Sequence, residues 1–246
     1  MNINIFSIFP DFTKTINDWS IIKRAIEKDL VNINSIDIRE FSKDRHSKTD
    51  DYSYGGGPGM IMTPQPIFDA LDTVKSDIKI YMSPRGKTLD QNLLRSLMKY
   101  ENISILCGHY EGIDQRVIDN LIDLEISLGD YILSGGELPA MVLVDGLVRL
   151  IPQALNNEES IINESFDRNL LEYDQYTRPK EYRGLKVPDV LIEGNHKLIK
   201  EFRLKSSLKN TLLYRPDLLE KVELDEKENA ILREIIEELE YSRGGK

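Results

Sequence analysis

The feature that most constrains the fold is a run of three glycines and one proline between an apolar strand and a helix. The run covers residues 128–141 and includes Gly129, Gly135, Gly136 and Pro139. Glycine tolerates positive φ and lets a bound molecule approach main-chain N–H and C=O groups, while proline fits the first turn of a helix. We therefore expect a ligand to lie against this backbone. The plain structural alternative is a tight strand-to-helix turn.

Two further turns of this kind follow apolar runs earlier in the chain. Residues 107–112, with two glycines, follow the run 103–106, and the turn 83–86, with Pro84 and Gly86, follows residues 80–82. Because the carboxyl ends of parallel strands meet at one edge of a sheet, which is where open α/β sheets hold their ligands, the three turns predict one shared pocket.

None of these turns is a standard phosphate-binding loop. The glycine cluster 55–59 lacks the Lys-Ser/Thr of a P-loop, and Met60 stands where a dinucleotide fingerprint needs its last glycine. The only positive charges available to the three turns come from Arg85 and His109. We therefore expect a nucleoside with a neutral or zwitterionic tail rather than a polyphosphate.

The order of apolar runs predicts the fold class. Between residues 3 and 150, short apolar runs alternate with helical periodicity, which is typical of an α/β fold with a mostly parallel sheet flanked by helices. The expected strands are 3–9, 33–38, 78–82, 103–107 and 124–128, and the expected helices are 18–29, 66–74, 89–99, 113–121 and 141–150.

The chain becomes polar after Pro152, which predicts a second domain. Helical patterns at 196–209 and 225–241, with no long β-type run beyond residue 176, indicate a small helical C-terminal domain. The expected division is therefore 1–155, a linker at 156–175, and 176–246.

Cysteine usage and hydropathy indicate a cytoplasmic protein. The single cysteine, Cys107, excludes an intramolecular disulfide and ends an apolar run, so we expect it to be buried. The apolar run 3–9 has no basic segment before it and stops at Pro10, and no apolar span is long enough for a membrane helix.

Charge is distributed unevenly along the chain. The formal net charge is −10, which at first argues against a nucleic-acid partner. However, residues 178–215 contain ten Lys and Arg against four acids, whereas residues 217–240 contain ten acids against three bases. The basic stretch also carries His196, Tyr182, Phe202 and Tyr214, so it is a candidate RNA-binding surface. The alternative is a solvated, ion-paired helical face.

Four motifs in order give the chain a specific resemblance. They are residues 54–60 (Tyr-Gly-Gly-Gly-Pro-Gly-Met), 107–116 (Cys-Gly-His-Tyr-Glu-Gly-Ile-Asp-Gln-Arg), 129–141 (Gly-Asp-Tyr-Ile-Leu-Ser-Gly-Gly-Glu-Leu-Pro-Ala-Met) and 176–179 (Tyr-Thr-Arg-Pro). Together they resemble the bacterial tRNA (guanine-N1)-methyltransferases, which modify the guanosine at position 37, 3′ of the anticodon. The similarity extends from residues 5–10 to residues 196–203.

The resemblance implies a fold, a cofactor and the residues that bind it. These enzymes belong to the SPOUT class, in which the chain threads a trefoil knot and three loops bind S-adenosylmethionine. Ordinary folding rules disfavour such a knot. The matching cofactor positions are Tyr81, Met82, Ser83, Pro84, Gly108, Tyr110, Glu111, Gly112, Leu128, Gly129, Tyr131, Leu133, Gly135, Gly136 and Pro139. Glu111 could complement the sulfonium charge or form an ordinary ion pair.

The chemistry of the implied reaction requires two catalytic groups. Guanine N1 carries a proton and is a poor nucleophile, so methyl transfer needs a general base and a donor for the charge that develops on O6. The resemblance assigns the donor to Arg149 and the base to Glu164, where the family usually has aspartate, with Glu172 as the second candidate base. On composition alone, Arg149 is a surface cation near a helix C-terminus and Glu164 is a linker acid.

Further positions are implied to contact tRNA, with several departures from the family pattern. The candidates are His46, Glu172, Arg178, His196 and Arg203, although His46 could equally cap a loop. The departures are His109 for arginine, Phe202 for tryptophan and Asp174 for proline.

The resemblance also implies a homodimer whose subunits share the active site, and no membrane or DNA partner. It associates the activity with Mg²⁺, but no metal-ligand spacing in the sequence locates a metal site. Two rival functions stay open from sequence: a knotted methyltransferase acting on ribose 2′-oxygens, and a non-catalytic RNA-binding protein.

Overall fold

The computed structural model describes residues 1–155, 165–166 and 168–244. The chain divides into two compact units, Met1–Asn156 and Asn157–Lys246. Among the described residues, no helix combines the length and the apolar character needed to cross a membrane.

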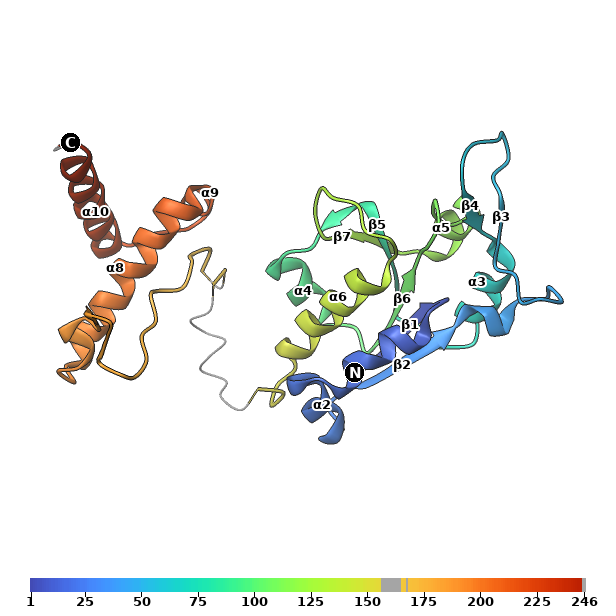
Figure 1. The fold of residues 1–246 in the computed structure, drawn as a ribbon, viewed down its shortest axis with the longest axis horizontal. Coiled ribbons are helices and arrows are strands. Elements are labelled where there is room, and N and C mark those ends of the chain that lie inside the picture. The colour runs from blue at the N-terminus through green and yellow to red at the C-terminus, as the bar shows by residue number, and fades with distance from the viewer. Residues whose placement is uncertain (156–164, 167, 245–246) are drawn as a thin grey trace. The chain divides into compact units, whose positions relative to one another are not determined.

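The first unit is built on a five-stranded parallel sheet (Figure 1). Its strand order is β2-β1-β6-β5-β7, and every neighbouring pair in it is parallel. The predicted parallel sheet is thus confirmed, with strands β1 (Asn2–Ser7), β2 (Asn32–Asp37), β5 (Ile78–Thr88), β6 (Asn102–Cys107) and β7 (Leu124–Ser127).

Helices cover both faces of this sheet because alternate strand residues point to opposite sides. On β1, Ile3 and Ile5 pack into one core cluster and Phe6 into another. The first cluster contains residues of α2 (Ser20–Glu27), α4 (Gln91–Leu97) and α6 (Glu137–Leu150). The second contains residues of α3 (Pro64–Leu71) and α5 (Gln115–Leu121). The five helices predicted for this region are present, within a few residues of the expected bounds.

Strand β5 is longer than predicted and changes the description of the first turn. The sequence predicts a strand that ends at Met82, followed by a Gly/Pro turn. Instead β5 continues to Thr88, with a register shift in its pairing to β7 between Met82 and Lys87. A Cβ on Gly86 would lie 2.4 Å from the Glu125 carbonyl carbon, so only glycine fits where this irregular segment crosses β7.

Several short elements were not predicted. They are α1 (Pro10–Lys14), the 3-10 helices η1 (Thr15–Asp18) and η2 (Ile38–Phe41), and the antiparallel strands β3 (Asp50–Tyr52) and β4 (Met60–Met62). The glycine cluster 55–59 forms the tip of this hairpin, and Gly55, Gly56, Gly57 and Gly59 all have positive φ. Met62 bridges to Ile113, which joins the hairpin to the loop after β6.

The second unit is mainly helical around a small core. Helices α8 (His196–Tyr214), α9 (Pro216–Leu219) and α10 (Glu226–Gly244) follow a two-stranded hairpin of β8 (Glu181–Tyr182) and β9 (Leu185–Lys186) and the 3-10 turn η3 (Asp189–Leu191). Leu170, Leu208 and Ile235 form the buried centre. The two long predicted helices are confirmed, whereas the hairpin was not predicted because its strands have only two residues each.

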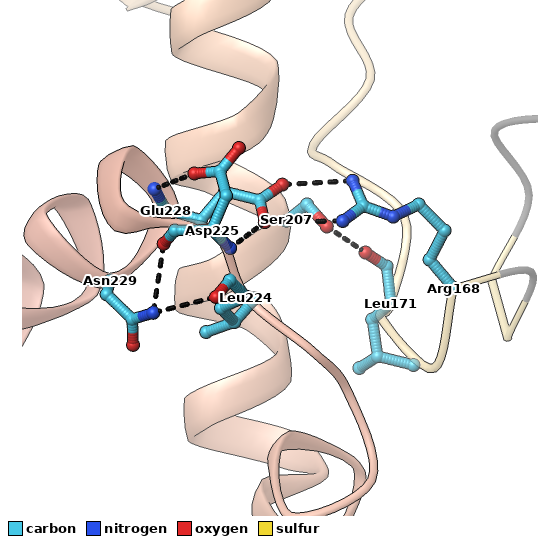
Figure 2. A network of polar contacts seen from close by, with 7 residues as sticks. All are labelled: Arg168, Leu171, Ser207, Leu224, Asp225, Glu228 and Asn229. Atoms are coloured by element: carbon cyan, nitrogen blue, oxygen red, sulfur yellow. Dashed lines mark hydrogen bonds and ion pairs between the residues drawn. The ribbon is translucent and has the colours of Figure 1, made fainter.

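Helix α10 begins with a capping box, and Arg168 connects this box to the segment before the hairpin (Figure 2). The Glu228 N–H donates to the Asp225 carboxylate at 2.8 Å, and the Asp225 N–H donates back to the Glu228 carboxylate at 3.0 Å. The Arg168 guanidinium binds both oxygens of Glu228 at 2.9 and 3.2 Å. Glu228 is buried, so these bonds replace the water that its carboxylate loses.

Candidate active site

A cavity of about 290 Å³ lies in the first unit where the loops after β6 and β7 meet residues 81–84 of β5. It is lined by every residue that the resemblance assigns to the cofactor. His109, Ile126, Ser127, Ile132 and Ser134 also line it, although they were not among the predicted cofactor residues. His109, Ile132 and Ser134 lie inside the predicted turns, and Ile126 and Ser127 end the strand directly before the third one, so proximity to these turns is the signal that could have identified them. The expected shared pocket is therefore present.

The loops after β6 and β7 cross at very short range. The Gly136 N–H donates to the Gly108 carbonyl oxygen at 2.9 Å. A Cβ on Gly136 would lie 2.8 Å from the Cys107 Cα and 2.9 Å from the Gly108 nitrogen. Since these neighbours are backbone atoms that cannot swing aside, glycine is required for this crossing, which shapes the cavity wall.

The cavity has almost no positive charge. Of the described residues that line it, none is Lys or Arg, and His109 and Glu111 are the groups that could carry charge near neutral pH. Arg85 forms hydrogen bonds with both carboxylate oxygens of Glu125, at 3.2 and 3.3 Å. This arrangement suits a neutral purine and a zwitterionic tail, and it lacks the cations that a polyphosphate needs.

Glu111 lies against the glycine-rich hairpin of β3 and β4. A Cβ on Gly59 would lie 2.3 Å from the Glu111 Cγ, and the Glu111 N–H donates to the Met60 carbonyl oxygen at 3.0 Å. The described residues include no ion-pair partner for Glu111. Its carboxylate is therefore available to a cationic group in the cavity.

Burial keeps two titratable groups protonated, Tyr81 in the cavity lining and Cys107 in the core beside it. Burial, reinforced by Glu125, raises the pKa of Tyr81 to about 12. Burial, together with the nearby Glu137 carboxylate, raises the pKa of the Cys107 thiol well above its usual value. Cys107 is fully buried, as predicted, and packs in the core.

Glu137 is a buried acid at the start of α6 that was not among the predicted site residues. Its carboxylate accepts a hydrogen bond from the Ser7 hydroxyl at 2.7 Å, and Ser7 in turn accepts the Phe9 N–H at 2.8 Å. Glu137 thereby connects the end of β1 to the helix that follows the third loop. An acid in this position also interacts favourably with the N-terminal end of the helix dipole.

Arg149 lies in the last turn of α6, far along the helix from the cavity. Ten residues separate it from Pro139, and at 1.5 Å rise per residue that is about 15 Å. Arg149 is half-buried. The structure therefore does not bring Arg149 to the cavity of its own chain.

The remaining predicted residues are spread over both units. Glu164 lies outside the described residues. Glu172 is half-buried, its N–H donates to the Ser165 hydroxyl at 3.0 Å, and Gln175 donates to its carboxylate. Arg203 lies over the Tyr173 ring at 4.7 Å, and His196 is the exposed first residue of α8. His46 is exposed in the first unit, where its N–H donates to Asp44 at 2.7 Å.

The described residues contain no group of three or more His, Cys, Asp or Glu side chains arranged to hold a metal ion. The structure therefore assigns no ligands to the Mg²⁺ that the resemblance implies.

Comparisons with known proteins agree on one family. The profile described as "tRNA (Guanine-1)-methyltransferase TrmD" matches residues 1–221. A tRNA (guanine-N(1)-)-methyltransferase of Caldanaerobacter subterraneus is 52% identical over 237 residues, which cover 95% of this chain and 98% of the relative. Proteins of the same description from Clostridioides difficile and Buchnera aphidicola are 48% and 50% identical, covering 90% and 95% of this chain and 98% and 96% of their own lengths.

Proposed function

The chain belongs to the tRNA (guanine-N1)-methyltransferase family, and from this premise we propose that it transfers the methyl group of S-adenosylmethionine to N1 of guanine 37 in tRNA. High similarity over nearly the whole chain supports the activity, and the SPOUT fold of the family agrees with the parallel sheet. The target position 3′ of the anticodon is the finer part of the proposal and follows from the motifs described above.

The observation that carries the proposal is the glycine-lined cavity, whose lining contains neither Lys nor Arg. At Gly108, Gly135 and Gly136, a Cβ atom would lie only 2.4 to 2.9 Å from neighbouring atoms, so a side chain at any of these three positions would collide with them. An adenine edge would bind backbone groups of the lining loops other than the Gly136 N–H and the Gly108 carbonyl, which bond to each other, and Tyr81, Leu128 and Leu133 supply apolar walls. Glu111 lies on the cavity wall, where its carboxylate can complement a sulfonium. When bound, S-adenosylmethionine supplies the methyl group.

The side chains of the protein must accept the proton of guanine N1 and stabilise the negative charge that develops on O6. A carboxylate within hydrogen-bond reach of guanine N1 accepts its proton, and a guanidinium donates to O6 as negative charge accumulates there. We assign these roles to Glu164 and Arg149, with Glu172 as the alternative base. Glutamate instead of aspartate adds one methylene, so its carboxylate reaches farther from the backbone than that of the family's usual residue, and the reach must be adjusted.

A homodimer with shared active sites accounts for the position of Arg149. Since about 15 Å of helix separates Arg149 from its own cavity, a second subunit is the simplest source of the guanidinium. Exposed apolar side chains surround the third loop and continue along α6: Tyr131, Ile132, Leu133, Leu138 and Val142. An apolar patch of this kind is typical of a protein–protein interface.

The basic residues of the second unit support tRNA as the partner, although some of them are paired with acids. Lys205 and Arg215 are paired with Glu238 and Asp217 at 2.7 Å. Such pairing lowers the charge available to RNA, so the binding surface is narrower than the count of basic residues indicates. We place Arg178, His196 and Arg203 on it.

Two measurements test the proposal. Calorimetric titration with S-adenosylmethionine should show one site per chain, and methyl transfer should occur with tRNA transcripts that carry guanine 37 but not with transcripts that carry adenine there. Methylation of both transcripts would favour a ribose 2′-oxygen methyltransferase. Binding without methyl transfer to either transcript would favour a non-catalytic RNA-binding protein. Chelation with EDTA in the same assay tests the Mg²⁺ requirement.

A further inference from the structure

A second cavity lies in the C-terminal unit, where the described chain runs into the β8–β9 hairpin. It has a volume of about 410 Å³. The base of the hairpin forms one side, where the Val187 N–H donates to the Lys180 carbonyl oxygen at 2.9 Å. The 3-10 turn η3 forms another side, and residues 176–178 form the third. The volume falls within the range of roughly 300 to 1,000 Å³ that is typical of small-ligand sites.

The hairpin that supports this cavity has a well-defined turn. Arg183 and Gly184 have φ values of 54° and 80°, and both are therefore left-handed, as a two-residue type I′ turn requires. The turn fixes the register of the Glu181–Lys186 and Tyr182–Leu185 pairs. Lys180 and Val187 are consequently held opposite one another at the cavity rather than on a loose loop.

The charged side chains that line this cavity are both cations. Arg178 and Lys180 contribute to the lining, and the lining residues include no acid. Within the described part of the chain neither cation makes an ion pair, whereas Lys186, Lys205 and Arg215 of the same basic stretch are paired with acids. The cavity therefore brings together two cations without an ion-pair partner among the described residues, in a unit where several other cations are paired with acids.

The rest of the lining is mostly apolar or aromatic. Val187 and Leu191 are half-buried at its base, Ile192 is 37% exposed, and Tyr176 is 48% exposed. An exposed phenol ring beside an apolar floor offers a face on which a planar base can stack, and two neighbouring cations offer hydrogen bonds to a phosphate.

We propose that this cavity binds a single unstacked nucleotide of the tRNA substrate, with its base against Tyr176 and its phosphate on Arg178 and Lys180. The inference rests on the proposed function for the identity of the RNA, and it adds a second recognition point outside the methyl-transfer cavity. A planar base next to a single negative charge matches the lining better than an extended acidic peptide, which has no flat apolar group for the floor.

Salt dependence of tRNA binding tests the role of the two cations. The double variant Arg178→Gln/Lys180→Gln should bind tRNA more weakly, and the slope of log affinity against log salt should fall by about 0.7 for each single-strand phosphate that the variant no longer neutralises. The matched control is Lys205→Gln/Arg215→Gln, which removes the same charge from paired cations and should leave the slope nearly unchanged. Equal slopes for wild type and the Arg178/Lys180 variant would overturn the proposal.

Stacking is tested separately at Tyr176. Tyr176→Leu should weaken tRNA binding roughly tenfold, and Tyr176→Phe should restore it, because stacking needs the ring and not the hydroxyl. Circular dichroism of each variant shows whether the second unit is folded. If Tyr176→Leu is folded and binds tRNA like wild type, no base stacks at this ring.

A titration with short probes identifies the ligand class. An RNA tetranucleotide should shift the NMR signals of residues 176–192 in the full-length protein, while inorganic phosphate alone shifts only signals near Arg178 and Lys180. A stronger response to an acidic peptide would overturn the proposal in favour of a protein partner. These readouts do not use S-adenosylmethionine, so failure of methyl transfer and failure of this subsite are distinguishable.

Discussion

Gly136 lies so close to Cys107 that a methyl group on the glycine would come within 2.8 Å of the Cys107 Cα. The approach joins the loop that leaves β7 to the end of β6, and it is reinforced by the hydrogen bond from the Gly136 N–H to the Gly108 carbonyl oxygen at 2.9 Å. The glycine-lined cavity thus depends on two backbone segments that touch directly.

Gly136→Ala should weaken S-adenosylmethionine binding by at least tenfold, because neither of the two backbone segments can move without opening the cavity. The matched control is Gly146→Ala in α6, whose Cβ would meet only the flexible end of Leu94 at 2.8 Å. Calorimetry on both variants measures the effect. Wild-type affinity in Gly136→Ala would show that the crossing does not shape the binding site.

Tyr81 should make the protein sensitive to alkali. Its pKa is about 12 in the folded state against 10.0 for a free side chain, so the unfolded chain loses the proton first as pH rises. The stabilisation is complete below pH 10 and should decline between pH 10 and 12 by about 2 to 3 kcal/mol. Denaturant unfolding at pH 9 and 11.5 should therefore show a smaller loss for Tyr81→Phe than for wild type. Equal losses would mean that folding does not change the pKa of the Tyr81 phenol.

Glu228→Ala should destabilise the second unit by about 1 to 2 kcal/mol, since it removes half of the capping box of α10 and leaves Arg168 without this carboxylate. Glu226→Ala, at an exposed position in the same first turn, is the control. Hydrogen exchange of α10 amides reports the change directly, while S-adenosylmethionine binding by the first unit should stay the same. Unchanged protection in Glu228→Ala would contradict the role of the box.

Glu164→Gln should abolish methyl transfer and leave S-adenosylmethionine affinity nearly intact, because the amide cannot accept the N1 proton. Glu172→Gln is measured in parallel. If Glu164→Gln retains full turnover and Glu172→Gln loses it, the general base is Glu172.

Subunit mixing tests the shared site. An Arg149→Ala chain has an intact cavity, and a Gly135→Arg chain has an intact guanidinium but a side chain forced against Glu137 and His109. Each alone should be inactive. After mixing and exchange, random pairing should restore about a quarter of wild-type activity, since half of the dimers contain one complete site. No recovery would indicate that each chain supplies its own Arg149.

The sheet and the three loops could be predicted from local sequence, because buried strands and glycine-containing turns leave signals within a few residues of one another. The continuation of β5 through Ser83–Thr88 could not, since it depends on pairing with β7 some forty residues later. The buried position of Glu137 could not be predicted locally either, because its hydrogen-bond partner, Ser7, lies 130 residues earlier in the sequence. The two hairpins were not predicted because strands of two or three residues carry no periodicity.

The candidate site was predictable in composition but not in geometry. Motif order selected the residues that line the cavity, and the helix predicted over 141–150 already placed Arg149 near a helix end, whereas the close crossing of Gly136 and Cys107 required the structure. The pairing of Arg85 with Glu125, which leaves the cavity without a guanidinium, also required the structure.

The walls of the glycine-lined cavity differ in construction: Tyr81 and Met82 belong to a strand that pairs with a neighbour on each side, whereas residues 108–112 and 128–136 belong to loops. For inhibitor design, the strand offers a fixed template on which a rigid heterocycle can be anchored. Chemical diversity is better directed at the exposed side chains of Tyr131 and Ile132 in the loop after β7, because substituents there leave the crossing of Gly108 and Gly136 undisturbed.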